Sequence, residues 1–135
     1  FKKYSPIGEL GNAAAQYTDV LSRTFALTAF VSDQDHILAV SGSGRRELTD
    51  HSVSQPLEKL MESRKPFDHD GSTDRAVLPC EGSTRALLCA APIVAAGDVI
   101  GSVGLLTEDR SARPDPAQQK AVSVAAAFLA KQMEE

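Results

Sequence analysis

Two apolar runs, residues 85–94 and 99–106, constrain the fold of this chain more than any other feature. Only Ala95-Ala96-Gly97-Asp98 separates them, and each run has the length of a typical strand. A short Gly-containing loop between two such runs predicts an antiparallel hairpin. The small residues Gly101, Ser102 and Gly104 interrupt the second run. They leave two interpretations open, either room for a ligand or close packing of neighbouring chain.

The helix expected at the N-terminus begins at Ser5-Pro6, because Ser is a good N-cap and Pro suits the first helical position. Apolar residues then recur at three- and four-residue steps to about Arg23. The spacing of hydrophobic residues and the positions of turn-forming residues predict the further elements. They are strands at 26–32 and 37–41, a helical turn from 45, a helix from the Ser54 cap to about Ser63, an extended piece at Phe67 and a strand at 76–79.

The last helix has the clearest start in the chain. Asp115 takes the N-cap, Pro116 the first helical position and Gln118 the capping-box position. Its apolar arc is wider than contact with one sheet needs. We therefore expect the two terminal helices to pair on one sheet face and to offer a second face to another copy. The predicted interface residues are Leu10, Ala14, Tyr17, Ala121, Val124, Phe128 and Leu129.

The order of these elements predicts an α+β fold for residues 1–135, in a single domain. The sheet is expected to be antiparallel, with the N- and C-terminal helices packed on one face. Short helices and loops of the middle segment would then cover the other face. A ligand pocket between the sheet and this middle segment is a natural consequence.

Net charge and cysteine content limit the functions open to the chain. The net charge of −4 and the absence of a Lys/Arg stripe make direct DNA binding by these residues unexpected. No apolar run approaches the roughly 20 residues that a membrane span requires. Cys80 and Cys89 have no metal or redox spacing, so we expect a cytoplasmic protein with reduced thiols.

A ligand site is predicted at the loop Ser41-Gly42-Ser43-Gly44 with Arg45 and Arg46, together with Phe67. A Gly/Ser loop frees backbone N–H groups, and guanidinium groups bind anions. The alternative is a plain turn followed by solvated arginines. No P-loop Lys-Ser/Thr ending is present.

The other polar clusters are expected to be structural. Asp68-His69-Asp70 is expected to be a solvated loop, because no further ligand cluster completes a metal site, and Asp33, Asp35 and His36 suit a turn. His51 is expected on the surface. We find no set of residues that predicts catalysis, and we expect no cofactor and no metal.

The chain also resembles a known family. The hairpin is similar to the signature hairpin of GAF domains. Segments 2–11, 39–46, 92–101 and 127–134 resemble the C-terminal domain of the stage V sporulation protein T family. That resemblance implies a GAF-like domain from a transcription regulator of endospore-forming bacteria. It also implies an N-terminal swapped-hairpin DNA-binding domain outside this chain, and assembly through helices of the GAF-like domain.

Two functions remain open from the sequence. In the first, the chain is a sensor whose unidentified small ligand changes helix packing and thereby DNA binding. In the second, it is an oligomerisation element without a ligand, forming a dimer or a tetramer. A remote third possibility is a GAF-type free-methionine-sulfoxide reductase, which would need an activated thiolate. DNA contact is expected only through the preceding domain, and no membrane contact is expected.

Overall fold

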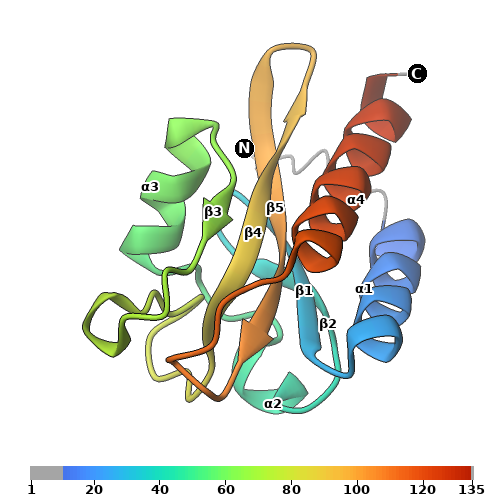
Figure 1. The fold of residues 1–135 in the computed structure, drawn as a ribbon. Coiled ribbons are helices and arrows are strands. Elements are labelled where there is room, and N and C mark those ends of the chain that lie inside the picture. The colour runs from blue at the N-terminus through green and yellow to red at the C-terminus, as the bar shows by residue number, and fades with distance from the viewer. Residues whose placement is uncertain (1–10, 135) are drawn as a thin grey trace.

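A five-stranded antiparallel sheet forms the centre of the computed structural model, which describes residues 11–134 (Figure 1). Its strands lie in the order β2-β1-β5-β4-β3, and every pair is antiparallel. The predicted hairpin is therefore confirmed at the middle of the sheet. The strands are β1 (Thr28–Asp33), β2 (Ile37–Ser41), β3 (Phe67–Asp68), β4 (Ala86–Ala95) and β5 (Asp98–Thr107).

The β4–β5 loop is shorter than predicted, because the strands continue to Ala95 and from Asp98. Only Ala96 and Gly97 lie between them, with φ angles of 50° and 86°. Two successive positive φ angles are typical of the type I′ turn, whose twist matches that of paired strands. The hairpin thus extends as a long, twisted ribbon beyond the rest of the sheet (Figure 1).

The terminal helices α1 (Gly11–Phe25) and α4 (Pro116–Glu134) cover one face of the sheet, which we call the back (Figure 1). The capping box at the start of α4 is present, since Asp115 accepts from the Gln118 N–H at 2.8 Å and Gln118 accepts from the Asp115 N–H at 2.9 Å. The predicted start of the first helix at Ser5-Pro6 lies outside the described residues. Ala14, Leu21, Val122 and Leu129 point from the two helices into the back core.

The opposite face, which we call the front, is covered by the middle segment (Figure 1). This segment contains α2 (Arg45–Leu48), α3 (Gln55–Ser63) and the short 3₁₀ helix η2 (Thr73–Arg75). Ser54 caps α3 as predicted, because its hydroxyl accepts from the Leu57 N–H at 3.2 Å and donates to the Leu78 carbonyl at 2.6 Å. The fold is therefore the expected α+β arrangement with one helical layer on each face.

Residues 76–79 do not form the predicted strand. The edge position beside β4 belongs instead to β3, which pairs Phe67 with Ala90 and Asp68 with Cys89. The 76–79 segment is irregular and is anchored by single backbone bonds, from Leu87 N to Val77 O at 2.7 Å and from Ser54 N to Pro79 O at 2.9 Å. The ring of Pro79 also removes an N–H that a ladder would use.

The glycines of β5 are explained by close packing. A Cβ at Gly101 would lie 2.0 Å from the backbone oxygen of Ser32, and one at Gly104 would lie 2.8 Å from the Phe30 ring. Neither position tolerates a side chain without movement of its neighbours. Of the two interpretations of these small residues, close packing is therefore the one that holds, because neighbouring chain fills the space.

Candidate functional site

The space predicted to hold a ligand on the front face is filled by the protein itself. Phe30, Leu57, Leu87 and Leu106 are all completely or almost completely buried there. The gap over β4 that Leu57, Leu60 and Phe67 line has a volume of about 10 Å³, which is room for about one water. Small-molecule sites are typically larger than about 300 Å³. This front core is therefore a packed layer in the described structure.

A larger pocket, of about 430 Å³, lies at the edge of the sheet beside the predicted Gly/Ser loop. We call it the loop pocket. It is lined by the end of α1, the start of β1 and the loop after β2. The residue before β4 and the residues at and just after the end of β5 complete the lining. Its lining residues are Ser22, Ala26, Leu27, Thr28, Gly42, Ser43, Arg85, Leu106, Thr107, Glu108 and Asp109.

The loop itself is fixed by backbone conformation. Gly42 and Gly44 have φ angles of 103° and 85°, which L side chains rarely adopt. The Thr28 hydroxyl donates to the Ser43 carbonyl at 2.8 Å and ties the loop to β1. A Cβ at Gly44 would lie 2.4 Å from Arg85 Nη1, so the loop rests directly on that guanidinium group.

Arg85 is the cation of this site, and sequence reasoning missed it. Its side chain is only 11% exposed and contacts two carboxylates, Glu47 at 3.2 Å and Glu108 at 2.8 Å. Glu47 and Arg85 are 38 positions apart in the chain, so no local spacing signals the pair. The one available hint was a charged residue at the start of a long apolar strand.

The residues predicted to bind a ligand do not converge on one place. Gly42 and Ser43 line the loop pocket, whereas Ser41 Oγ lies 3.1 Å from Thr18 Oγ1 under α1. Arg45 and Arg46 are exposed on α2 and are not part of the pocket lining. Phe67 lines the small front gap instead. The expected pairing of the loop with Arg45 and Arg46 is thus replaced by a pairing with Arg85.

Negative charge dominates around the loop pocket. The Thr84 hydroxyl donates to Glu47 at 2.9 Å, and hydrogen bonds from Thr84 are the main reason that the pKa of Glu47 is lowered. Hydrogen bonds from Ser111 likewise lower the pKa of Asp109. Both groups therefore stay ionised at neutral pH. With Glu108, three carboxylates accompany the single guanidinium group of Arg85, which disfavours a simple anion.

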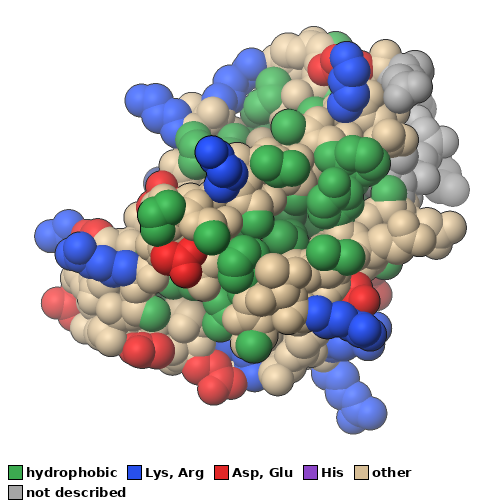
Figure 2. All heavy atoms as spheres, turned by 45° about the vertical axis from the view of Figure 1, so that its right-hand side comes forward, with side chains coloured by type: hydrophobic (Ala, Val, Ile, Leu, Met, Phe, Trp, Pro, Cys, Tyr) green, Lys and Arg blue, Asp and Glu red, His purple; other side chains and the backbone are tan. Residues whose placement is uncertain are grey.

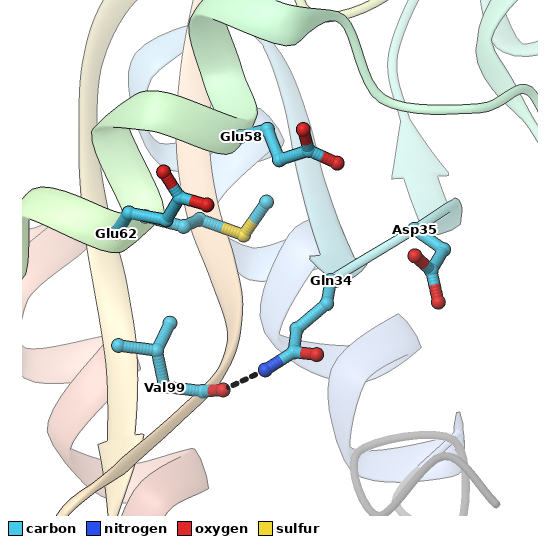
Figure 3. A pocket seen from close by; sticks show the side chains of 6 residues that line it. Gln34, Asp35, Glu58, Glu62 and Val99 are labelled. Carbon is cyan, nitrogen blue, oxygen red and sulfur yellow. Dashed lines mark hydrogen bonds between the residues drawn. The ribbon is translucent and has the colours of Figure 1, made fainter.

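A second pocket, of about 200 Å³, opens beside α3. Figure 3 shows Glu58 and Glu62 extending from α3 and Asp35 from the β1–β2 turn, with the Gln34 amide donating to the Val99 carbonyl. Asp33 accepts from the backbone N–H groups of residues 35 and 36, both at 2.7 Å, so the predicted turn role is confirmed. Within residues 11–134, no group of acidic, His or Cys side chains has the arrangement of a metal site.

The expectation of a solvated loop at Asp68-His69-Asp70 is wrong for His69, and both thiols are buried. His69 is buried, and its Nε2 lies 2.6 Å from the Arg110 carbonyl, while Asp70 pairs with Arg75 at 2.9 Å. Burial raises the pKa of the Cys89 thiol to about 12 and also raises that of Cys80. A thiol with a raised pKa forms little of the reactive thiolate at neutral pH.

The helical back of the molecule carries an exposed apolar surface. Val20, Val124 and Phe128 are 58%, 55% and 39% exposed, and they are the only large hydrophobic residues so exposed between residues 11 and 134. The rings of Tyr17 and Phe128 lie 4.9 Å apart and join the two helices. Figure 2 shows hydrophobic side chains gathered on this side of the molecule. We call Tyr17, Val20, Val124 and Phe128 the helix stripe.

The structure narrows the predicted interface. Ala14 and Leu129 are fully buried against the sheet, and Ala121 is half-buried, so the first two are not available to a partner while this packing holds. Leu10 lies outside the described residues. The exposed members of the prediction are Val124 and Phe128, with Tyr17 partly covered by Phe128.

Solved structures with this fold define its class. The chain is similar to the GAF domain of an Acinetobacter phosphoenolpyruvate-protein phosphotransferase, with a TM-score of 0.75 and 11% identity over 92% of this chain and 81% of that one. It is also similar to the cofactor-binding GAF domain of the nutrient sensor CodY from Clostridium difficile, with a TM-score of 0.64 and 10% identity over 88% and 83% of the two chains. At these identities the likeness shows the fold alone, and the fold is that of a GAF domain.

Sequence comparison then gives the family. Residues 9–134 match the family described as "Stage V sporulation protein T C-terminal, transcription factor". The stage V sporulation protein T of Bacillus subtilis (strain 168) is 36% identical over 99% of this chain and 74% of its own length. The chain therefore belongs to the stage V sporulation protein T C-terminal family, as its resemblance indicated. No helix among residues 11–134 is long and apolar enough to cross a membrane.

Proposed function

We propose that this chain is the regulatory part of a cytoplasmic sporulation transcription regulator, and that it assembles with a second copy of itself through the helix stripe. The exposure of Val20, Val124 and Phe128 on two adjoining helices is the observation that supports this most strongly. Exposed apolar residues that cluster on one surface typically mark an interaction site. Family membership supports the regulatory role.

A second copy is the occupant that this surface suits. A two-fold interface uses the same patch on both partners, and a stripe of neutral apolar residues is complementary to itself. The tilted Tyr17–Phe128 pair supplies an aromatic centre of the kind that dominates interface energetics. The Arg23–Asp19 pair of α1 is well exposed, and such pairs contribute little energy at a rim.

Light scattering during size-exclusion chromatography tests the assembly role. Phe128→Glu and Val20→Glu each place a charge on the helix stripe, so we expect the mass of the wild-type oligomer to fall to a smaller species. Leu129→Glu is not a clean test, because Leu129 is fully buried and its replacement would unfold the back core. Gln55→Glu adds the same charge on exposed α3 and should leave the mass unchanged. An unaltered mass in both stripe variants would contradict the proposed interface.

Ligand sensing is a second candidate function, and the loop pocket is the observation that favours it. Its volume of about 430 Å³ falls in the range of small-molecule sites. A thermal-shift screen of nucleotides, amino acids and other metabolites tests it. A ligand at about a hundredfold over its Kd should stabilise the fold by about 2.7 kcal/mol. An absence of any shift across the screen would favour assembly without sensing.

We propose that the chain is not an enzyme. The remote reductase alternative needs a thiolate, and burial raises the pKa of both thiols. Incubation of the chain with free methionine sulfoxide and dithiothreitol tests this directly. We expect no methionine above the level formed without protein, and turnover that Cys89→Ala abolishes would overturn the proposal.

A further inference from the structure

The loop pocket holds charges of both signs close together. Arg85 forms part of its wall and is held from one side by Glu47, while Glu108 and Asp109 stand at the end of β5. Arg85 is 11% exposed and Glu108 is 74% exposed. The cation is therefore fixed within the wall, whereas the carboxylate of Glu108 reaches out into solvent.

We propose that the loop pocket binds a small zwitterion of the α-amino-acid type, a proposal that rests on the sensing function above. The ligand carboxylate takes the place of Glu108 on Arg85 Nη2. The ligand ammonium group lies between Glu108 and Asp109. Glu108 is exposed to solvent, which weakens its ion pair with Arg85, so its exchange for a ligand carboxylate is feasible.

The balance of charge selects this class of ligand. A simple anion would bring a further negative charge to a site where Glu47 and Glu108 already contact Arg85 and Asp109 lines the wall. A zwitterion adds no net charge and provides a partner for each sign. The site also includes the C-terminal end of α1, where the helix dipole is negative and favours an ammonium group.

The uncharged part of the wall suits the rest of an amino acid. The hydroxyls of Ser22 and Ser43 make no hydrogen bond to any residue from 11 to 134 and can donate to a carboxylate. Ala26, Leu27 and Leu106 add apolar surface for a ligand side chain.

The position of the pocket offers a way for a bound ligand to affect assembly. Ser22 belongs to the last turn of α1 and Ala26 directly follows the helix, so both lie close along the chain to Val20 of the helix stripe. A ligand held there contacts the same helix that the proposed interface uses. Binding therefore affects assembly only if the ligand has different affinities for the two arrangements of α1.

Amide NMR of the chain tests the proposal with each standard L-α-amino acid at millimolar concentration. We expect at least one of them to shift the signals of Leu27, Ser43 and Thr107. The strongest binder is then compared with its carboxamide and with the carboxylic acid that lacks its amino group. Each analogue should bind about tenfold more weakly or worse, because each loses one charge-assisted contact.

Glu108→Gln keeps an acceptor for Arg85 but removes the charge offered to the ammonium group, so the affinity should fall about tenfold. Glu62→Gln, in the acidic pocket beside α3, is the matched control and should leave the affinity unchanged. No shift with any amino acid, equal binding of the carboxamide, or unchanged binding by Glu108→Gln would each overturn the proposal. Light scattering of the same samples reports assembly separately.

Discussion

Helices cover both faces of the sheet, but among residues 11–134 only those of the back leave large hydrophobic side chains highly exposed. On the front, α3 has nine residues and buries Leu57 and Met61, and no large hydrophobic of the described middle segment is highly exposed. On the back, α1 and α4 bury their own core residues and still expose Val20, Val124 and Phe128. This contrast is the basis of our proposal that the front serves packing alone and the back serves packing and association.

The sharpest test of this comparison is Leu57→Ala, measured beside Leu129→Ala. Both side chains are fully buried, one in each core. Each substitution should lower the free energy of unfolding by about 2–5 kcal/mol, because a cavity replaces packed atoms. Urea denaturation followed by circular dichroism gives both values. A loss below about 1 kcal/mol for Leu57→Ala alone would mean that the front holds an open pocket rather than a core.

Gly104→Ala probes the front from the side of the sheet. The new methyl group would lie 2.8 Å from both the Phe30 ring and the Cys89 carbonyl. Overpacking of this kind should destabilise the fold by about 1–3 kcal/mol. The matched control is Gly11→Ala, where a Cβ meets nothing within 4 Å and adds helix propensity. If Gly104→Ala were as stable as wild type, the front layer would have spare room.

Local signals in the sequence predicted most of the elements because those signals act over a few residues. The Ser54 cap, the Asp115–Gln118 capping box and the Gly97 turn are all present. The boundaries of elements differ from the predicted ones where a neighbouring element uses the same residues. β1 begins at Thr28 rather than at 26, because Ala26 has a φ of 56° and Leu27 N bonds to Ser22 O to end α1.

The candidate site was harder to predict, because contacts between distant residues make it. The Gly/Ser loop was recognised, but the guanidinium group under it comes from Arg85, directly before β4. Arg45 and Arg46 are exposed and do not line the pocket. Filling of the front face also escaped prediction. Whether Gly104 leaves a gap depends on Phe30 from another strand, and no spacing within β5 reveals that contact.

The two helix caps, one on each face, allow a further comparison of the faces through smaller changes in the free energy of unfolding. Ser54 is buried and makes two hydrogen bonds, whereas the Asp115 cap of α4 is exposed. Ser54→Ala should cost about 2 kcal/mol and Asp115→Ala about 1 kcal/mol, because only the first also removes the donor to a partly buried carbonyl, that of Leu78. Thermal unfolding of both variants measures the difference. Equal losses would show that the front cap is no more enclosed than the back one.

The smallest effect concerns the thiols, since Cys80 belongs to the front core and Cys89 to the back. Burial raises the pKa of Cys89 from its ordinary value of 9.0 to about 12. Below the ordinary value the thiol is protonated in both the folded and unfolded states, so stability does not depend on its titration. Above it, the unfolded chain releases a proton that the folded chain keeps, and stability falls with rising pH.

The stability advantage of wild type over Cys89→Ala should therefore shrink with rising pH. By about pH 9.5 the loss should reach slightly less than about 1 kcal/mol. Lys and Tyr groups titrate in the same range, but they are common to both proteins. Their contributions to the pH dependence of stability therefore cancel in the comparison. Urea denaturation at about pH 7.5 and about pH 9.5 supplies the four values needed. A difference that stays constant would mean that Cys89 ionises as easily when folded as when unfolded, and that the back core admits solvent at β4.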